Sequence, residues 1–139
     1  MVVVSAGSAV GTCRYVVDRL REGGHKVGLV KIKMFRPFPR HLVRQALAGR
    51  KKIAVIERDV IPGGGGIFCQ EIKWALSGHQ TVPIYGFVSG LGGNDITVKL
   101  IEKAILYTMR EEPTEEVIWL GLPEKEVSDE DDKRAIKIY

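Results

Sequence analysis

The chain has 139 residues, of which 45% are apolar, 27% are charged and 7% are aromatic. This length and composition allow the chain to bury a core of its own, which excludes a wholly disordered protein. No apolar run approaches the roughly 18 residues of a membrane helix, and no basic leader with a cleavage site follows Met1. We therefore expect a cytoplasmic protein with no membrane partner.

The net charge of +4 is unevenly distributed along the chain. Residues 1–110 carry 17 Lys or Arg and 7 Asp or Glu, whereas residues 111–139 carry 4 and 10. A basic body with an acidic end fits a nucleic-acid binder that masks itself. It fits equally well a segment that docks onto a basic partner subunit, and composition alone leaves both interpretations open.

Strands and helices are predicted to alternate along the chain, with glycine-containing turns between them. Short β-branched or alternating apolar runs predict strands at Val2–Ser5, His25–Lys33, Ile53–Glu57, Thr81–Val88 and Val117–Leu120. Apolar residues at helical spacing predict helices over Ser8–Glu22, about Arg40–Ala48, Ile67–Ser77, and from a cap at Asn94 or Asp95 to about Met109. Four such units in a row predict right-handed crossovers and a three-layer α/β/α domain with a mostly parallel sheet of about five strands.

Pro113 divides the predicted domain, residues 1–112, from an extension over residues 113–139. In this extension an apolar run at 117–122 precedes an acidic tail. Burial of the apolar run is worth several kcal/mol at ~25 cal/mol per Å². We therefore expect Val117–Leu122 to lie against the body and much of Glu124–Lys137 to stay exposed. The alternative is that Trp119 docks onto a partner subunit.

Two glycine-rich loops precede helices without forming a known phosphate-binding motif. Gly7 and Gly11 have GxxxG spacing, which we interpret as a tight turn with close helix–strand packing and Ser8 as the cap. An anion on the free N–H groups there is the alternative. Gly63–Gly66 is not followed by GK[ST], so it is no Walker loop. Its four glycines indicate either close approach of another backbone or a flexible loop.

No arrangement of side chains predicts catalysis. Cys13 and Cys69 lie 56 positions apart and read as small buried hydrophobes, and two cysteines are too few for a cluster or zinc site. The three histidines have no metal-ligand spacing. We therefore predict no catalytic residue and no metal ligand, and we assign no cofactor-binding residue.

A basic stretch at 31–52 holds eight cations and no acid, namely Lys31, Lys33, Arg36, Arg40, Arg44, Arg50, Lys51 and Lys52. A solvated face or a subunit contact is the favoured interpretation. The alternative is an autonomous polyanion- or nucleotide-binding α/β module that acts through this stretch. Few aromatic residues accompany the cations, so nucleic acid is the less favoured partner.

The motifs taken in order resemble those of a known family. They are Val3–Ser8 with Gly11 and Thr12, Phe35–Pro39 (FRPFP), Glu57–Arg58, Tyr85–Phe87 and Gly90–Thr97 (GLGGNDIT). Over about residues 2–110 their order and spacing resemble the C-terminal domain of the α subunit of pyruvate:ferredoxin oxidoreductase and related 2-oxoacid:ferredoxin oxidoreductases. The layout is also similar to the C-terminal domain of transketolase.

This resemblance implies a place in an enzyme that oxidatively decarboxylates a 2-oxoacid, first of all pyruvate, to an acyl-CoA. That enzyme uses thiamine diphosphate, Mg and [4Fe–4S] clusters, and ferredoxin and CoA act at the level of the complex. The family holds its cofactors largely on other domains and subunits, so the resemblance implies a non-catalytic assembly domain that binds none of them. Its candidate contacts with those domains are Arg36, Gly63, Gly64, Gly65, Gly66, Gly92, Gly93, Asn94 and Asp95. The family commonly has an arginine where this chain has Asn94.

Overall fold

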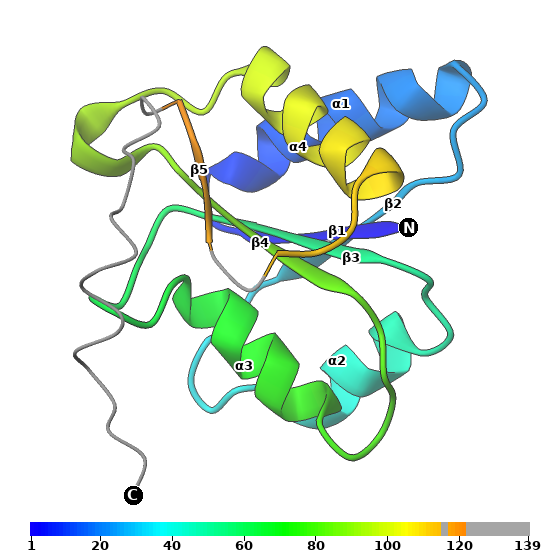
Figure 1. Cartoon of the computed structure of the whole chain (residues 1–139), viewed down its shortest axis with the longest axis vertical. Helices are drawn as coiled ribbons and strands as arrows, with labels where there is room; N and C mark the ends of the chain where they lie inside the picture. Colours follow the sequence, from blue (N-terminus) through cyan, green and yellow to red (C-terminus); the bar gives the residue numbers. More distant parts are fainter. Residues whose placement is uncertain (115–116, 122–139) are drawn as a thin grey trace, which may run out of the picture.

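A parallel sheet of five strands separates two pairs of helices in the computed structural model, which describes residues 1–114 and 117–121 (Figure 1). The strands are β1 Val2–Ala6, β2 Gly28–Ile32, β3 Ile53–Glu57, β4 Ile84–Ser89 and β5 Ile118–Leu120, in the spatial order β2-β1-β3-β4-β5. The helices are α1 Ala9–Glu22, α2 Arg40–Leu47, α3 Ile67–Leu76 and α4 Val98–Arg110, with a short 3-10 turn, η1, at Leu91–Gly93. The predicted three-layer α/β fold of the transketolase C-terminal kind is confirmed.

The core lies on both faces of the sheet because the central strands are apolar at every position but one or two. On one face Val3, Ala54, Ile56 and Phe87 pack with α1 and α4. On the other face Val2, Val4, Ile53 and Val55 pack with α2 and α3. The two cysteines are buried as predicted, one in each of these layers.

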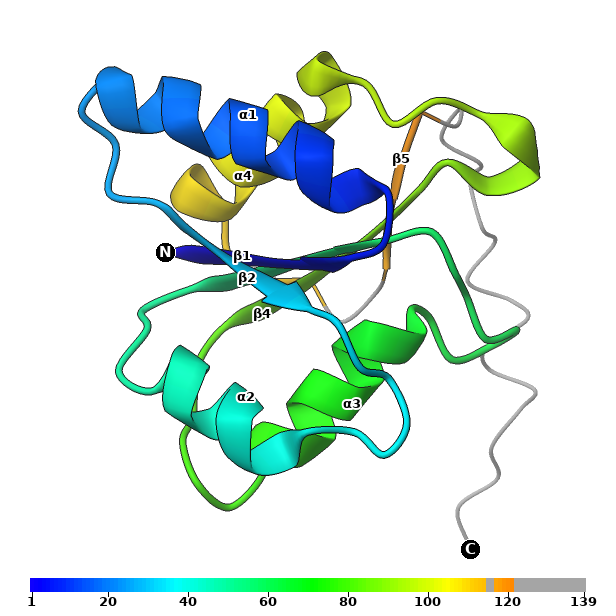
Figure 2. The ribbon, with the colours of Figure 1, turned by 180° about the vertical axis from the view of Figure 1, so that it is seen from behind.

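The last strand–helix–strand connection has the opposite hand to the others. The connections through α3 and α4 step in the same direction across the sheet, yet α3 lies beside α2 and α4 lies beside α1 (Figures 1 and 2). The expectation that every crossover is right-handed is therefore wrong at the fourth one. The preference for right-handed crossovers depends on the twist of the strands, and β5, an edge strand of three residues, has little twist.

The cap of α4 is Thr97, whose Oγ1 accepts a hydrogen bond from the N–H of Leu100 at 3.3 Å. The prediction of Asn94 or Asp95 as the cap is wrong. Asn94 lies too early to serve, because α4 begins only at Val98, and Asn94 instead ends the η1 turn, where its Nδ2 donates to the Leu91 carbonyl at 2.9 Å. Strands β2 and β4 also begin three residues later than predicted, at Gly28 and Ile84.

The turn after β1 corrects two further expectations. Gly7 has a φ of +62°, so the tight turn is present. Ser8 makes no capping hydrogen bond, since its hydroxyl faces an arginine from another loop. A Cβ on Gly11 would meet nothing within 4 Å, so this glycine does not serve close helix–strand packing.

The start of the extension lies against the body, as the burial argument predicts. Strand β5 pairs in parallel with the end of β4, and Leu120 is 5% exposed. Trp119 points outward and is 45% exposed. Leu122 and Glu124–Lys137 lie outside the described residues, and the division of the chain at residue 112 stays a prediction. Among the described helices, none has the length and apolar character needed to cross a membrane.

Candidate functional site

Three loops meet at the carboxyl ends of the central strands. They follow β1 at Gly7 and Ser8, β3 at Arg58–Gly66, and β4 at Gly90–Asp95. From β1 the chain enters α1 on one face of the sheet, and from β3 it enters α3 on the other face. A parallel sheet places its ligand crevice at such a switch point. The side chains of these loops are therefore the first candidates for function.

Two carboxylates cap the N-terminus of α3 at this edge. The Glu57 Oε2 and Oε1 atoms accept the N–H groups of Phe68 at 2.6 Å and Cys69 at 3.1 Å. Asp59 Oδ1 accepts the N–H of Ile67 at 3.0 Å. Three of the four N–H groups that a helix start leaves unpaired are thereby satisfied by side chains from the end of β3.

Glu57 is 4% exposed, which makes its ionisation costly. Burial, followed by the hydrogen bond and the negative charge of Asp59, raises the pKa of Glu57 to about 8. The two N–H donors of α3 favour the charged form but do not offset the burial. At neutral pH this carboxyl group is therefore largely protonated, and it works as a buried hydrogen-bonding group of the loop.

The glycine run beside Glu57 is packed by atoms of this same chain. A Cβ on Gly66 would overlap the Glu57 carboxylate, and a Cβ on Gly65 would overlap the side chain of Val117. Gly65 also has a φ of +78°, which side-chain-bearing residues rarely adopt. The close approach predicted for the run is present at these two positions, but it is made by the side chains of Glu57 and Val117 and not by another backbone. Gly63 and Gly64 are exposed.

Arg58 connects the three loops. Its Nη1 donates to Ser8 Oγ at 3.3 Å, and its Nη2 donates to the Gly90 carbonyl at 3.1 Å. Gly90 has a φ of +78°, and a Cβ there would lie 2.9 Å from Arg58 Nε. The predicted contact residues Gly92, Gly93, Asn94 and Asp95 follow in the same loop, and all four are exposed.

Three of the eight cations of the basic stretch, Arg36, Arg40 and Arg44, hold α2 and its preceding loop onto α3. Arg36 Nη2 lies 2.7 Å from Glu71 Oε1, and the Arg36 guanidinium stacks on Phe35 with its Cζ 3.8 Å from the ring centroid. Arg44 Nε donates to the Ala75 carbonyl at 2.6 Å. The i, i+4 spacing of Arg40 and Arg44 is visible in the sequence, but their partners on α3 are not.

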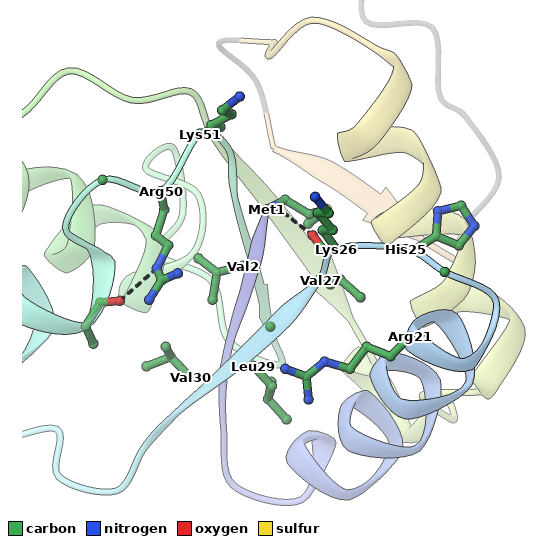
Figure 3. Close-up of a pocket in the computed structure, with 14 residues that line it drawn as sticks. Met1, Val2, Arg21, His25, Lys26, Val27, Leu29, Val30, Arg50 and Lys51 are labelled. Carbon is green, nitrogen blue, oxygen red and sulfur yellow. Dashed lines mark hydrogen bonds between the residues drawn. The ribbon is translucent and has the colours of Figure 1, made fainter.

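A separate basic hollow lies at the opposite edge of the sheet (Figure 3). Arg21, Lys26, Arg50 and Lys51 contribute cations to its lining, no acid lines it, and the edge strand β2 forms part of its wall. Arg50 Nε donates to the Ala46 carbonyl at 3.3 Å. Two residues of the predicted basic stretch therefore reach this hollow, and none of the predicted contact residues does.

The thiols have no partners suited to a metal site. Burial raises the pKa of both Cys13 and Cys69 to about 11. Within the described part of the chain, no group of three or more His, Cys, Asp or Glu side chains is placed to hold a metal ion.

The three-layer parallel fold, with its loops gathered at the switch point, defines a domain of the transketolase C-terminal class. Comparison with known proteins gives the family. The sequence model of pyruvate:ferredoxin oxidoreductase core domain II matches residues 1–101, and the chain belongs to this family.

Relatives with described roles match over most of the chain. This chain is 38% identical over 125 residues to the pyruvate synthase subunit PorA of Methanothermobacter thermautotrophicus, and the match covers 90% of this chain and 31% of the relative. It is 45% identical over 104 residues to PorA of Thermotoga maritima, a match that covers 74% of this chain and 26% of the relative. It is 39% identical over 127 residues to the ketoisovalerate oxidoreductase subunit VorA of Pyrococcus furiosus, a match that covers 87% of this chain and 32% of the relative. The chain thus spans about three tenths of the length of these relatives.

Proposed function

We propose that this chain is an assembly domain of a 2-oxoacid:ferredoxin oxidoreductase, an enzyme that converts a 2-oxoacid to an acyl-CoA and reduces ferredoxin. Membership of the core domain II family is the observation that carries the proposal. The names of the relatives, pyruvate synthase and ketoisovalerate oxidoreductase, support a 2-oxoacid as the substrate class. Pyruvate is the first substrate to test, and the other subunits of the enzyme are the proposed partners.

The geometry at the switch point supports a positioning role rather than a reacting one. The oxygens of Glu57 accept the N–H groups of α3, and Arg58 holds Ser8 and Gly90. These bonds fix the three loops relative to one another. The exposed Gly63, Gly92 and Gly93 then present backbone without side chains, onto which a neighbouring domain can pack closely. We propose that Arg36, Asn94 and Asp95 border this contact.

The cofactors of such an enzyme do not fit the residues described here. A diphosphate-bound Mg²⁺ requires free oxygen ligands, whereas both oxygens of Glu57 and the Oδ1 of Asp59 accept α3 N–H groups, and no group of three or more described His, Cys, Asp or Glu side chains is placed to hold a metal ion. A [4Fe–4S] cluster requires thiolates. Cys13 and Cys69 lie in layers on opposite faces of the sheet, each with its pKa at about 11. We therefore propose that thiamine diphosphate, Mg²⁺ and the clusters are held by other parts of the enzyme.

Purification of the protein that carries this sequence from its source cells tests the proposal. The preparation should contain the other oxidoreductase chains and should reduce ferredoxin when supplied with CoA and pyruvate or 2-ketoisovalerate. A homogeneous preparation that contains no other chain and reduces no ferredoxin with either acid would refute it.

Binding of a polyanion is the second candidate function, and the basic hollow is the observation that favours it. Arg21, Lys26, Arg50 and Lys51 surround a space with no acid in its lining. Such binding would weaken steeply with salt, with a slope of about −0.9 in log K against log salt for each phosphate neutralised on duplex DNA. Fluorescence anisotropy with labelled DNA and with a nucleotide at low salt tests this candidate. Failure to bind either probe eliminates it.

A further inference from the structure

The outer surface of α2 and α3 carries an exposed tryptophan that is stacked against an arginine. The Arg40 Cζ lies 3.2 Å from the centroid of the Trp74 ring, and Trp74 is 56% exposed. Lys73 precedes Trp74 on α3 and is also exposed. We refer to Arg40, Lys73 and Trp74 as the Arg40–Trp74 surface. It lies away from the glycine loops, since Trp74 is in the last turn of α3 and those loops meet its first turn.

The charge around this surface is predominantly positive. No Asp or Glu occurs from residue 23 to residue 56, so α2 contains none. Helix α3 contains only Glu71, which pairs with Arg36. The opposite layer is mixed, because α1 carries Asp18 and Glu22 among its arginines. The α2–α3 layer therefore presents a net positive field beside a large apolar ring.

We propose that the Arg40–Trp74 surface binds an acidic protein surface on another domain or subunit of the oxidoreductase, a proposal that rests on the proposed function. The cations of this surface would be complemented by carboxylates on the partner. The Trp74 indole would be complemented by an apolar depression between those carboxylates. Tryptophan and arginine are enriched among the residues that dominate binding energy at protein interfaces. The remaining length of the relatives, about seven tenths, leaves ample protein to supply this partner.

The stacked guanidinium makes a protein the better-fitting occupant than a nucleic acid. Single-stranded nucleic acids bind through bases that stack on open aromatic faces. One face of Trp74 is already covered by Arg40, while the outward donors of the guanidinium remain suited to a carboxylate.

Carbodiimide crosslinking of the protein purified from source cells tests this inference. The carbodiimide activates a carboxyl group, and the Lys73 amine displaces it as a urea to form an amide bond. We expect Lys73 to be joined to an Asp or Glu outside this 139-residue sequence. Trp74→Ala and Arg40→Ala should each lower the yield of that crosslink about tenfold. The matched control is Tyr15→Ala, because Tyr15 is 55% exposed and stacks with Arg19 on the opposite layer, and its yield should not change.

The outcomes separate this inference from the proposed function. If the other oxidoreductase chains and ferredoxin reduction are present but the Lys73 crosslink is missing, or is insensitive to Trp74→Ala, the surface proposal is wrong and the proposed function stands. A Lys73 crosslink to a second copy of this chain, or nucleic acid retained by the wild type and lost in Arg40→Ala, also overturns it. Absence of the oxidoreductase chains overturns both. Circular dichroism of each variant confirms that the exposed substitutions leave the fold intact.

Discussion

The buried carboxyl group of Glu57 predicts a specific dependence of stability on pH. Its pKa of about 8 in the folded protein lies above the ordinary value of 4.5, which applies to the unfolded chain. Below pH 4.5 the Glu57 carboxyl group is protonated in both the folded and the unfolded chain, so its ionisation does not affect the free energy of unfolding. Between pH 4.5 and about 8 the unfolded chain ionises and the folded chain does not, so stability falls as pH rises. Above pH 8 both are ionised and the loss is complete.

The size of this loss follows from the shift in pKa. At about 1.4 kcal/mol per unit, the rise from 4.5 to about 8 corresponds to about 5 kcal/mol at high pH. Glu57→Gln removes the titration but retains one carbonyl acceptor for the α3 N–H groups. We therefore expect the stability of the wild type minus that of Glu57→Gln to fall by about 1.4 kcal/mol per pH unit between pH 5 and 8.

Urea unfolding at a series of pH values measures this difference, with Glu102→Gln as a control because Glu102 lies at the surface 3.9 Å from Arg19. If the difference for Glu57→Gln changes with pH no more than the difference for the control, the reasoning is refuted. Such a result would mean that the two N–H donors and the positive end of α3 stabilise the carboxylate as strongly as burial opposes it.

Three further predictions concern the loops and the last strand. Gly66→Ala should destabilise the protein by about 2 kcal/mol or more, because the added methyl group overlaps Glu57. Gly11→Ala should stabilise it by about 0.5–1 kcal/mol, because the added methyl group on α1 meets nothing within 4 Å. Urea unfolding measures both changes. Arg58→Ala should speed hydrogen exchange in all three loops while leaving α2 unchanged, and a change confined to its own loop would contradict the bridging role. Removal of residues 117–139 should lower the melting temperature by several degrees because it uncovers the β4 edge and removes buried Leu120; an unchanged melting temperature would contradict this.

The sequence predicts the elements well because each depends on a local pattern. Runs such as Ile53–Glu57 bury both faces of a strand, and the stripe that contains Cys13, Val16 and Val17 buries one side of a helix. The fifth strand could be predicted from the cost of leaving Val117–Leu122 in water. The cap of α4 could not, because Asn94 and Thr97 are both good capping residues. Only the structure shows that Asn94 ends the η1 turn and that the helix starts later, after Thr97.

The candidate site was harder to predict because its bonds join distant parts of the chain. Arg58 lies 50 positions from Ser8 and 32 from Gly90. Arg44 lies 31 positions from Ala75. A sequence shows that such residues are polar and spaced on one helix face, but it does not show which carbonyl or hydroxyl group they meet. The basic stretch could therefore be interpreted as a surface for polyanions, although three of its eight cations join α2 and its preceding loop to α3.

Glu57 and the glycine run form a single unit. The N-cap residue of α3 is Gly66, which has no side chain to cap the helix, so the N–H groups of Phe68 and Cys69 depend on the carboxyl oxygens of Glu57 at the end of β3. That carboxyl group can reach the helix only because Gly66 carries no Cβ. The glycines thus carry a conformational cost that the buried hydrogen bonds offset. A loop built in this way holds one conformation, which is what a surface that must match a neighbouring domain requires.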